Sequence, residues 1–313
     1  MRKTVIIMSA LLALCSCSKE QRPSAGEELS GSPICFDGFD ANVETKTART
    51  ASTSISTLHV TASTGTSGSS DAKWPASGTA MSNASVTLSS GTGASGYYWP
   101  AEATSMNFYA TSWSVAPTMA SSGPTASVTA GTTDYMAGAA KAVSSADYIG
   151  TTTPVPVTMN HILAWLSDIK LTTSAEGLTA TITSIKVTPA YKTRTYNLAK
   201  GTFSGGTANS TATTLTAPSG GWASIPYNTS FTSVGSYTGD TFWIPGDVTI
   251  SVTYTVSGNG YTSGSLTKSA TVSLAAGKKS TVTGTLPTDA SPIRFSVTCT
   301  AWGTATVNAG TLS

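Results

Sequence analysis

The chain has 313 residues and almost no net charge, with 17 Lys and Arg against 15 Asp and Glu. Charged residues make up only 10% of it, against about 25% in an ordinary soluble domain. So balanced a charge implies neither a nucleic-acid partner nor an anionic membrane surface. Ser, Thr and Gly are abundant instead. Because Thr favours strands while Ser and Gly favour turns, this composition is typical of a β-rich extracellular protein.

The N-terminus has the pattern of a secretion signal. Two basic residues precede an apolar stretch from Val5 to Leu14, which is too short for the roughly 20 residues of a membrane-spanning helix. Small residues and two cysteines follow. Cys17 suits the lipid-accepting position, whereas Cys15 directly follows the bulky Leu14. We predict a lipoprotein signal over residues 1–16 and an outer-membrane anchor of several acyl chains, such as palmitate, on Cys17. An ordinary cleaved signal with incidental cysteines is the alternative.

A polar tether and a short apolar strand come next. Residues 17–33 are polar, aperiodic and rich in Ser, Pro and Gly, which indicates a flexible tether. The stretch 34–49 begins with the apolar residues of a buried strand and ends in a polar segment. Its apolar positions are Ile34, Phe36 and Phe39, and its basic residues are Lys46 and Arg49. The small polar residues after Arg49 make an accessible site for a trypsin-like protease.

The length after the signal suits two β-sandwich domains. About 280 residues can form two sandwiches of ordinary size. We expect an N-terminal domain over residues 34–153 and a C-terminal domain over residues 154–313. The Pro-containing stretch 150–157 is the best candidate linker, because Pro cannot sit inside a sheet.

The clearest strands form a hairpin in the second half of the chain. Apolar residues alternate with Thr and Ser from Val248 to Val256, and again from Leu266 to Leu274. The Ser257–Gly260 segment between them can supply the positive φ angles of a tight turn. One face of such a hairpin is buried and the other is exposed to solvent, as in an antiparallel sandwich.

The C-terminal region 292–313 contains a second alternating strand. Its five apolar positions are Ile293, Phe295, Val297, Cys299 and Ala301. The polar residues between them form the opposite face, and Thr304 to Leu312 could extend the strand. Cys35 and Cys299 could form one disulfide, but two distant cysteines make no disulfide framework. We interpret both as small buried side chains.

No constellation of residues predicts catalysis, a metal or a cofactor. The two histidines, His59 and His161, are far apart in sequence and lack further ligands at zinc spacing. A literal G-x-G-x-x-G match at residues 91–96 is followed by "YYWP" and not by a helix that could hold phosphates. No Ser nucleophile elbow exists. The aromatic residues are scattered at strand positions, which favours core packing over a sugar-binding face.

Several short motifs occur in an order that resembles one known family. They are "YYWP", "MNFYA", "DYMAG", "NHILAWLSDIKL", "FWIPGDVTISVTY" and "IRFSVTCTAW". Together with the lipoprotein signal and the basic cleavage region, they resemble the fimbrillin family of lipoprotein-derived type V pilins of Gram-negative gut and oral bacteria. The likeness covers nearly the whole chain.

The resemblance implies an all-β fold of two tandem transthyretin-like antiparallel β-sandwich domains. It implies export as a lipoprotein, removal of the first strand by a trypsin-like protease at Arg49 or alternatively Lys46, and insertion of the C-terminal strand of another subunit into the vacated groove. Because such a head-to-tail contact does not close, it gives a surface fimbria that supports adhesion.

The implied partners are other fimbrial subunits, whether copies of this chain or accessory pilins. The outer membrane, the protease and a host or bacterial surface ligand would also be partners. Two alternatives stay open: a fimbrial tip adhesin that binds glycan or protein, and a surface lipoprotein that does not polymerise. A secreted enzyme is disfavoured by the missing catalytic residues.

Overall fold

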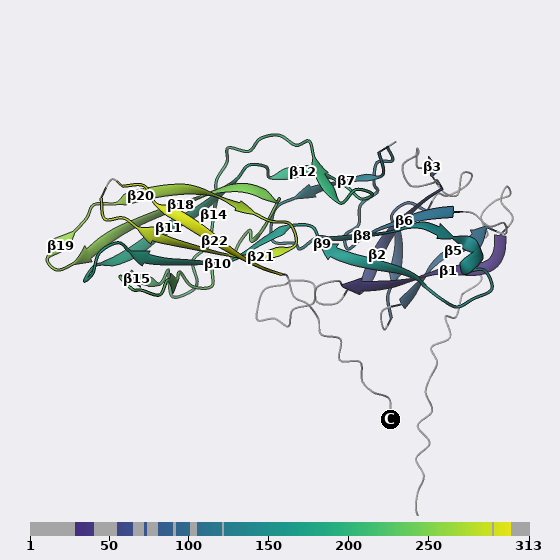
Figure 1. The fold of residues 1–313 in the computed structure, drawn as a ribbon, viewed down its shortest axis with the longest axis horizontal. Helices are drawn as coiled ribbons and strands as arrows, with labels where there is room; N and C mark the ends of the chain where they lie inside the picture. Colours follow the sequence, from purple (N-terminus) through teal and green to yellow (C-terminus); the bar gives the residue numbers. More distant parts are fainter. Residues whose placement is uncertain are drawn as a thin grey trace, which may run out of the picture.

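The computed structural model describes residues 29–40, 55–64, 72–73, 81–89, 92–100, 105–120, 122–289 and 291–301. Cys17, Lys46 and Arg49 lie outside these ranges. The described part is built of strands, with a single helical turn at Ser145–Asp147, which confirms the all-β class. The molecule is elongated, with sheets gathered toward each end of its long axis (Figure 1). Within these ranges, none of the helical structure is long and apolar enough to cross a membrane.

The N-terminal sheet has eight strands in the order β3-β2-β6-β8-β9-β1-β5, with β4 added beside β2. The strands are β1 (Leu29–Asp40), β2 (Thr57–Thr64), β3 (Ala72–Lys73), β4 (Ala84–Thr87), β5 (Thr92–Pro100), β6 (Ser105–Thr111), β8 (Met136–Ser144) and β9 (Val155–His161). One cluster of buried side chains, centred on Phe36, Trp99 and Phe108, fills the space that this sheet encloses.

The C-terminal half contains two larger sheets and a small one. The first has the order β16-β10-β21-β22 with β17 beside β10, and the second has the order β14-β11-β18-β19 with β15 and β20 added. The small sheet is β13-β12-β7. The strands are β7 (Thr125–Thr129), β10 (Ala164–Thr173), β11 (Thr179–Pro189), β12 (Thr193–Asn197), β13 (Thr202–Ser204), β14 (Thr213–Thr214), β15 (Ser224–Pro226), β16 (Thr232–Ser233), β17 (Phe242–Trp243), β18 (Gly246–Gly258), β19 (Tyr261–Thr262), β20 (Leu266–Leu274), β21 (Lys278–Leu286) and β22 (Arg294–Ala301).

The predicted hairpin is confirmed in β18 and β20. Val248 pairs with Val272 and Tyr254 pairs with Leu266, while every second side chain from Val248 to Val256 is fully buried. On the wet face, three cross-strand pairs of hydroxyl groups lie 2.7 to 3.0 Å apart. Such pairs stabilise a sheet without charge, which suits a chain in which only 10% of the residues are charged.

The sheets are mixed, which corrects the expectation of purely antiparallel sandwiches. β1 pairs with β9 in parallel, and β10 pairs with β21 in parallel. In both pairs the partners are far apart in sequence, so the intervening chain can cross over and return in the same direction. Local hairpin patterns in the sequence carry no information on such distant pairings.

The two cores also divide the chain differently from the expected boundary between residues 153 and 154. β9 lies beside β1, and its apolar side chains belong to the N-terminal cluster. Pro156 therefore sits in a sheet, at the second residue of β9, close to the strand start where Pro is tolerated. Conversely, β7 pairs with β12, and its Val128 packs in the C-terminal core.

A buried contact between a histidine and a carboxylate lies at the junction of the two cores. His161, the last residue of β9, has its Nδ1 2.7 Å from a carboxylate oxygen of Asp134, and both side chains are 1% exposed. The Gly277 N–H donates to the carbonyl of Leu163, two residues later. His161 is thus part of the structure that joins the halves.

Tyr196 of β12 makes the stability of the C-terminal core sensitive to alkaline pH. Burial raises the pKa of Tyr196 from 10.0 to about 12. Between these values the unfolded chain has lost this proton and the folded chain has kept it, so stability falls as pH rises, by at most about 1.4 kcal/mol per pH unit. We expect Tyr196→Phe to remove this part of the loss in urea unfolding at pH 9 and pH 11. An equal loss in both proteins would contradict the prediction.

Candidate functional site

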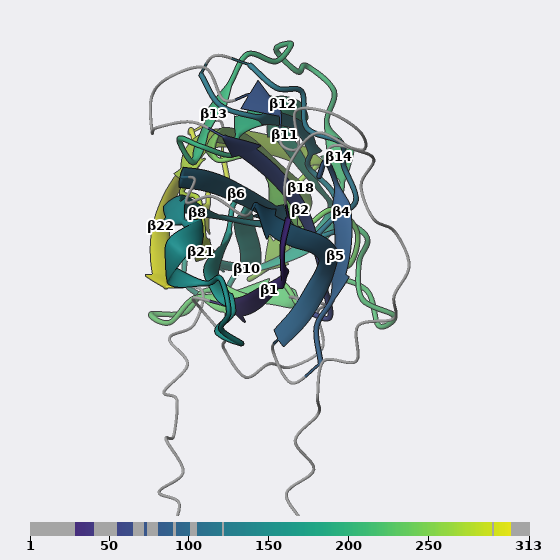
Figure 2. The ribbon, with the colours of Figure 1, turned by 90° about the vertical axis from the view of Figure 1, so that its right-hand side faces the viewer.

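The first strand is an internal part of the N-terminal sheet and not its edge. β1 pairs antiparallel with β5 on one side and parallel with β9 on the other, and it lies next to β5 in the view along the long axis (Figure 2). It begins at Leu29, so residues 29–33 of the expected tether belong to the strand. Backbone pairing with β5 needs no apolar pattern, which is why composition alone missed this start.

Two predicted residues of β1 fill the core. Ile34 and Phe36 are both 0% exposed, and the Phe36 ring meets the Phe108 ring edge-on at 5.1 Å between centroids. Phe36 lies opposite Gly93 of β5, where a side chain would collide with the backbone carbonyl of Thr87. Full burial of such side chains contributes about 1.5–3 kcal/mol each.

Two hydrogen bonds fix the register of β1. The Ser95 hydroxyl donates to the Ile34 carbonyl at 2.9 Å in a buried position. The Gly150 N–H donates to the Ser32 hydroxyl at 2.8 Å. These partners are separated by 61 and 118 residues, so sequence inspection did not single them out.

The second half of β1 is a poorer match to the core. Gly38 pairs with Val157 and Asp40 pairs with Met159, and both partners are fully buried. Phe39 pairs with Thr158, which is exposed, so Phe39 has the opposite parity to Ile34 and Phe36. The side chain of Phe39 lies outside the described part of the structure. The register positions beyond Phe36 that match the core are thus occupied by Gly and Asp.

β22 is an edge strand with a single described partner. It pairs only with β21 among the described strands. Of the five apolar positions expected there, Ile293 is 3% exposed and Phe295 and Val297 pack partly buried against the C-terminal core. Cys299 and Ala301 are exposed. Buried and exposed side chains therefore do alternate, but only the first three apolar residues are covered, fully or in part, by their own subunit.

The two cysteines form no disulfide with each other. Cys35 is half-buried and Cys299 is exposed, with its Sγ 3.7 Å from the Ser280 hydroxyl. The expectation of a buried Cys299 is wrong, because Cys299 lies near the end of an edge strand that pairs only with β21 among the described strands.

Phe295 covers a glycine on the neighbouring strand. It pairs with Gly284 of β21, and any side chain at Gly284 would collide with the Phe295 ring. An aromatic ring over a glycine protects the exposed backbone of an edge pair. Phe295 and Val297 are therefore the two residues of β22 that pack against the apolar core of their own subunit.

Two tyrosine hydroxyls hold the segment that leads into β22. The buried Tyr254 hydroxyl donates to the Pro287 carbonyl at 2.6 Å, and the Tyr261 hydroxyl donates to the Thr288 carbonyl at 3.2 Å. Burial, followed by the charge of Asp289, raises the pKa of Tyr254. The phenol therefore stays protonated and keeps donating over the whole physiological pH range.

Removal of the Tyr254 hydroxyl is expected to loosen this attachment. Tyr254→Phe would leave the Pro287 carbonyl without its donor, which costs about 1–3 kcal/mol in a buried site. Amide hydrogen exchange in β22 should become faster, while exchange in β5 and β9 stays unchanged. Tyr261→Phe, which removes an exposed hydrogen bond, is the matched control with a smaller effect. Equal exchange rates in β22 for Tyr254→Phe and the wild type would contradict the prediction.

Both strands start at a pole of the molecule and run toward the junction. In β22, Arg294 pairs with Thr285 and Ala301 pairs with Lys278, which adjoins the Gly277 contact at the junction. In β1, Leu29 pairs with Pro100 and Asp40 pairs with Met159, near the end of β9. The pole where β22 begins also carries β19, at the left of Figure 1, whereas β5 lies at the other end.

The pole beside β19 exposes three large apolar side chains. They are Tyr227, Phe231 and Tyr261, which are 41% to 45% exposed. The Tyr227 N–H bonds the carbonyl of Leu178, just before β11, and Tyr261 begins β19. These large exposed apolar residues of the described chain thus lie near the segment that leads into β22.

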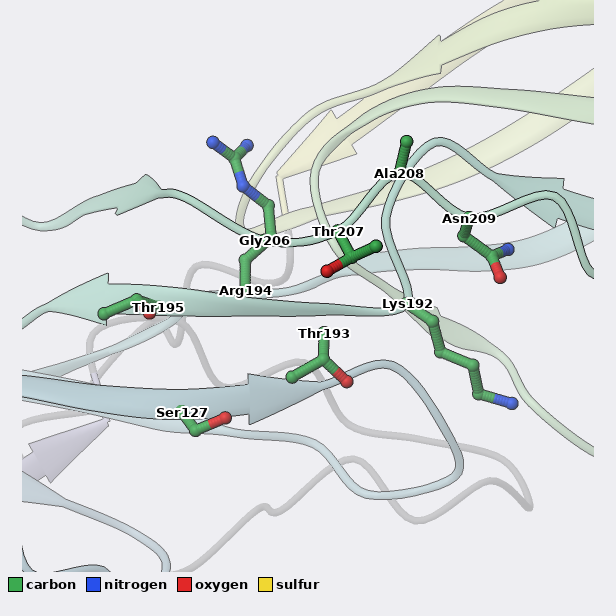
Figure 3. Close-up of a pocket in the computed structure, with 9 residues that line it drawn as sticks. All are labelled: Ser127, Lys192, Thr193, Arg194, Thr195, Gly206, Thr207, Ala208 and Asn209. Atoms are coloured by element: carbon green, nitrogen blue, oxygen red, sulfur yellow. The ribbon is translucent and has the colours of Figure 1, made fainter.

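A polar hollow of about 400 Å³ lies beside β12, lined by Ser127, Thr193, Asn209 and neighbouring residues (Figure 3). Its two cations are already engaged. The Arg194 guanidinium donates to the Gly205 carbonyl at 2.9 Å and stacks on the Tyr191 ring at 4.6 Å, while Lys192 pairs with Asp240 at 3.6 Å. No group of three His, Cys, Asp or Glu residues suited to a metal occurs in the described ranges.

One family model and several solved structures resemble this chain. The model for fimbrillin-like proteins matches residues 44–302. A search of curated proteins finds no match. A fimbrial protein from Bacteroides vulgatus ATCC 8482 superposes with a TM-score of 0.61 at 15% identity, over 87% of this chain and 100% of that chain. A "putative cell adhesion protein" from Parabacteroides distasonis ATCC 8503 gives a TM-score of 0.53 at 12% identity, over 88% and 98%.

These structural likenesses show a shared fold, and the family match supplies the assignment, because it extends over most of the sequence and includes strands of both cores. The chain belongs to the fimbrillin-like family.

Proposed function

We propose that this protein is a structural subunit of a cell-surface fimbria, polymerised by donor-strand exchange and supporting adhesion. The observation that carries the proposal is the position of β1. Loss of β1 would expose the edges of β5 and β9 that now pair with it. These edges would border an apolar groove, since Ile34 and Phe36 are fully buried between them. An open groove of this kind is a template for an added strand.

The other half of the exchange is β22. It has one described neighbour and apolar side chains that its own subunit covers only in part. A strand that is held at one edge can leave with less loss of backbone pairing than an internal strand. The groove and the donor start at opposite poles, so successive subunits join head to tail and the contact does not close.

Proteolytic processing would convert the precursor, in which β1 fills the groove, into a subunit with an open groove. The precursor travels to the outer membrane as a lipoprotein on Cys17, and a trypsin-like protease cuts after Arg49, or alternatively after Lys46. Both sites fall between β1, which ends at Asp40, and β2, which begins at Thr57. A cut there severs the covalent link between β1 and the rest of the sheet and removes the lipid together with the strand.

The proposal is tested on protein sheared from the surface of cells that express the chain. N-terminal sequencing and intact mass should give a start at Thr50, without lipid, in SDS-resistant ladders. A start at lipidated Cys17 in a monomeric species would overturn the polymer role and leave a surface lipoprotein. An unlipidated, processed species that is found only at fibre ends would instead indicate a tip adhesin.

A further inference from the structure

A short sequence occurs twice, once in each strand of the proposed exchange. Residues 32–36 have the sequence SPICF, and residues 291–295 have the sequence SPIRF. We propose that the two segments occupy the same place in the N-terminal groove, so that β1 is replaced by β22 of a second copy of this chain. Ser291 would then lie where Ser32 lies, Ile293 where Ile34 lies, and Phe295 where Phe36 lies. This inference rests on the proposed function.

Each repeated side chain has a specific contact in the groove. The Ser32 hydroxyl accepts the Gly150 N–H, Ile34 is buried under the Ser95 hydrogen bond, and Phe36 packs edge-on against Phe108. Ser291, Ile293 and Phe295 carry the same groups at the same spacing. The donor can therefore reproduce every one of these contacts without any change in the acceptor.

Both phenylalanines also lie opposite a glycine. Phe36 pairs with Gly93 and Phe295 pairs with Gly284. On exchange, Phe295 would therefore leave Gly284 of its own subunit and lie opposite Gly93 on β5 of the next subunit. A shift of the donor by two residues would put Val297 opposite Gly93 and Phe295 at the position of Ile34, a smaller side chain that is fully buried.

The single difference between the segments falls where it is tolerated. Cys35 has the opposite parity to Ile34 and Phe36 and is half-buried. Arg294 has the same parity within its segment and is exposed in its own subunit. A long basic side chain at this position can extend to solvent from the outer face of the sheet.

Beyond the repeat, the donor fits the groove better than β1 does. The register would place Val297 at position 38 and Cys299 at position 40, beside the buried Val157 and Met159. At these positions β1 has Gly and Asp. Exchange therefore replaces Gly38 and Asp40 with two apolar residues. It also removes Cys299 and the half-buried Val297 from contact with water.

Backbone pairing and direction favour the same exchange. In its own subunit β22 pairs with one described strand, whereas in the groove it would pair with β5 and β9. β1 and β22 each run from one end of the molecule toward the junction. When the end of one subunit that carries β19 meets the end of the next subunit that carries β5, the donor therefore enters the groove in the direction of β1. That contact would also bring Tyr227, Phe231 and Tyr261 against the next subunit and cover them.

Disulfide trapping tests both the partner and the register. The soluble chain from Ser18 carries Cys35→Ala and Cys299→Ala, with a site for a sequence-specific protease inserted after Arg49, so that the native protease plays no part. Ala94, which is opposite Cys35, is changed to Cys together with Arg294→Cys. The matched control is Ala94→Cys with Ser296→Cys, which reports a register shifted by two residues. Opposed residues of antiparallel strands are close enough for a disulfide in either case.

After cleavage we expect SDS-resistant ladders whose subunits are joined by the disulfide between positions 94 and 294, with at least about tenfold less of the disulfide between 94 and 296. Ladders trapped through 94 and 296 would overturn the register and leave donor-strand exchange standing. A purified, cleaved chain that stays monomeric would overturn the second copy as partner. The proposed function then fails separately, and only if the chain is also absent from fimbriae sheared from cells.

Discussion

Phe36→Ala is expected to lower the free energy of unfolding of the uncleaved chain by about 3–5 kcal/mol. The Phe36 ring is fully buried between β5 and β9 and packs against Phe108. The cavity cannot collapse easily, because Gly93 and the carbonyl of Thr87 are already in close contact on one side. Urea unfolding of the uncleaved chain, compared with that of the wild type, measures the change.

The same substitution should have no effect once β1 has been removed. Cleaved and polymerised Phe36→Ala chains should unfold like the wild type, because the residue is no longer present. Cys35→Ala is the matched control, since it changes a half-buried neighbour on the other face and should cost less than about 1 kcal/mol. A loss as small as that for Phe36→Ala would show that β1 is not a core strand.

The outline of the fold was predictable because much of it is local. The hairpin of β18 and β20 has an apolar and polar alternation on both strands and a turn with glycines at positive φ. The same rule identified Ile34, Phe36 and the alternating face of β22. In each case the pattern states which side chains share a face, and that information is complete within one strand.

The remaining features depend on neighbours that are distant in sequence. Pro156 argued against a strand, yet β9 lies between β8 and β1, because a Pro near a strand start removes little pairing. β7 joins a strand from the other half of the chain. Alternation likewise gave the parity of Cys299 but not its exposure, since exposure depends on how many strands lie beside β22.

The proposed assembly site shows the same division between local and distant information. The buried residues of β1 and the alternating face of β22 were found from their own strands. The Ser95 and Gly150 hydrogen bonds, which hold β1, were not. One signal was available throughout: the repeat of Ser, Pro, Ile and Phe at residues 32–36 and 291–295. A comparison of the sequence with itself finds this repeat.

Phe295→Asp is expected to abolish polymerisation while leaving a folded subunit. In its own subunit Phe295 is only partly buried on an edge strand, so a carboxylate there can reach water at modest cost. In the groove the same position is closed on all sides, and an unpaired buried charge costs several kcal/mol. A loss of about 3 kcal/mol weakens each contact by more than a hundredfold. Cleaved protein should therefore run as a monomer in SDS gels and by light scattering.

The neighbouring residue supplies the control that separates burial from charge. Ser296→Asp introduces the same carboxylate one residue later, on the exposed face of β22, and should leave ladder formation within a few-fold of the wild type. Phe295→Leu, which keeps an apolar side chain of smaller size, should polymerise weakly. Ladders of normal length from Phe295→Asp would exclude β22 as the donor. The exposed apolar pole around Tyr261 would then have to hold the subunits together, and the groove behind β1 would need another occupant.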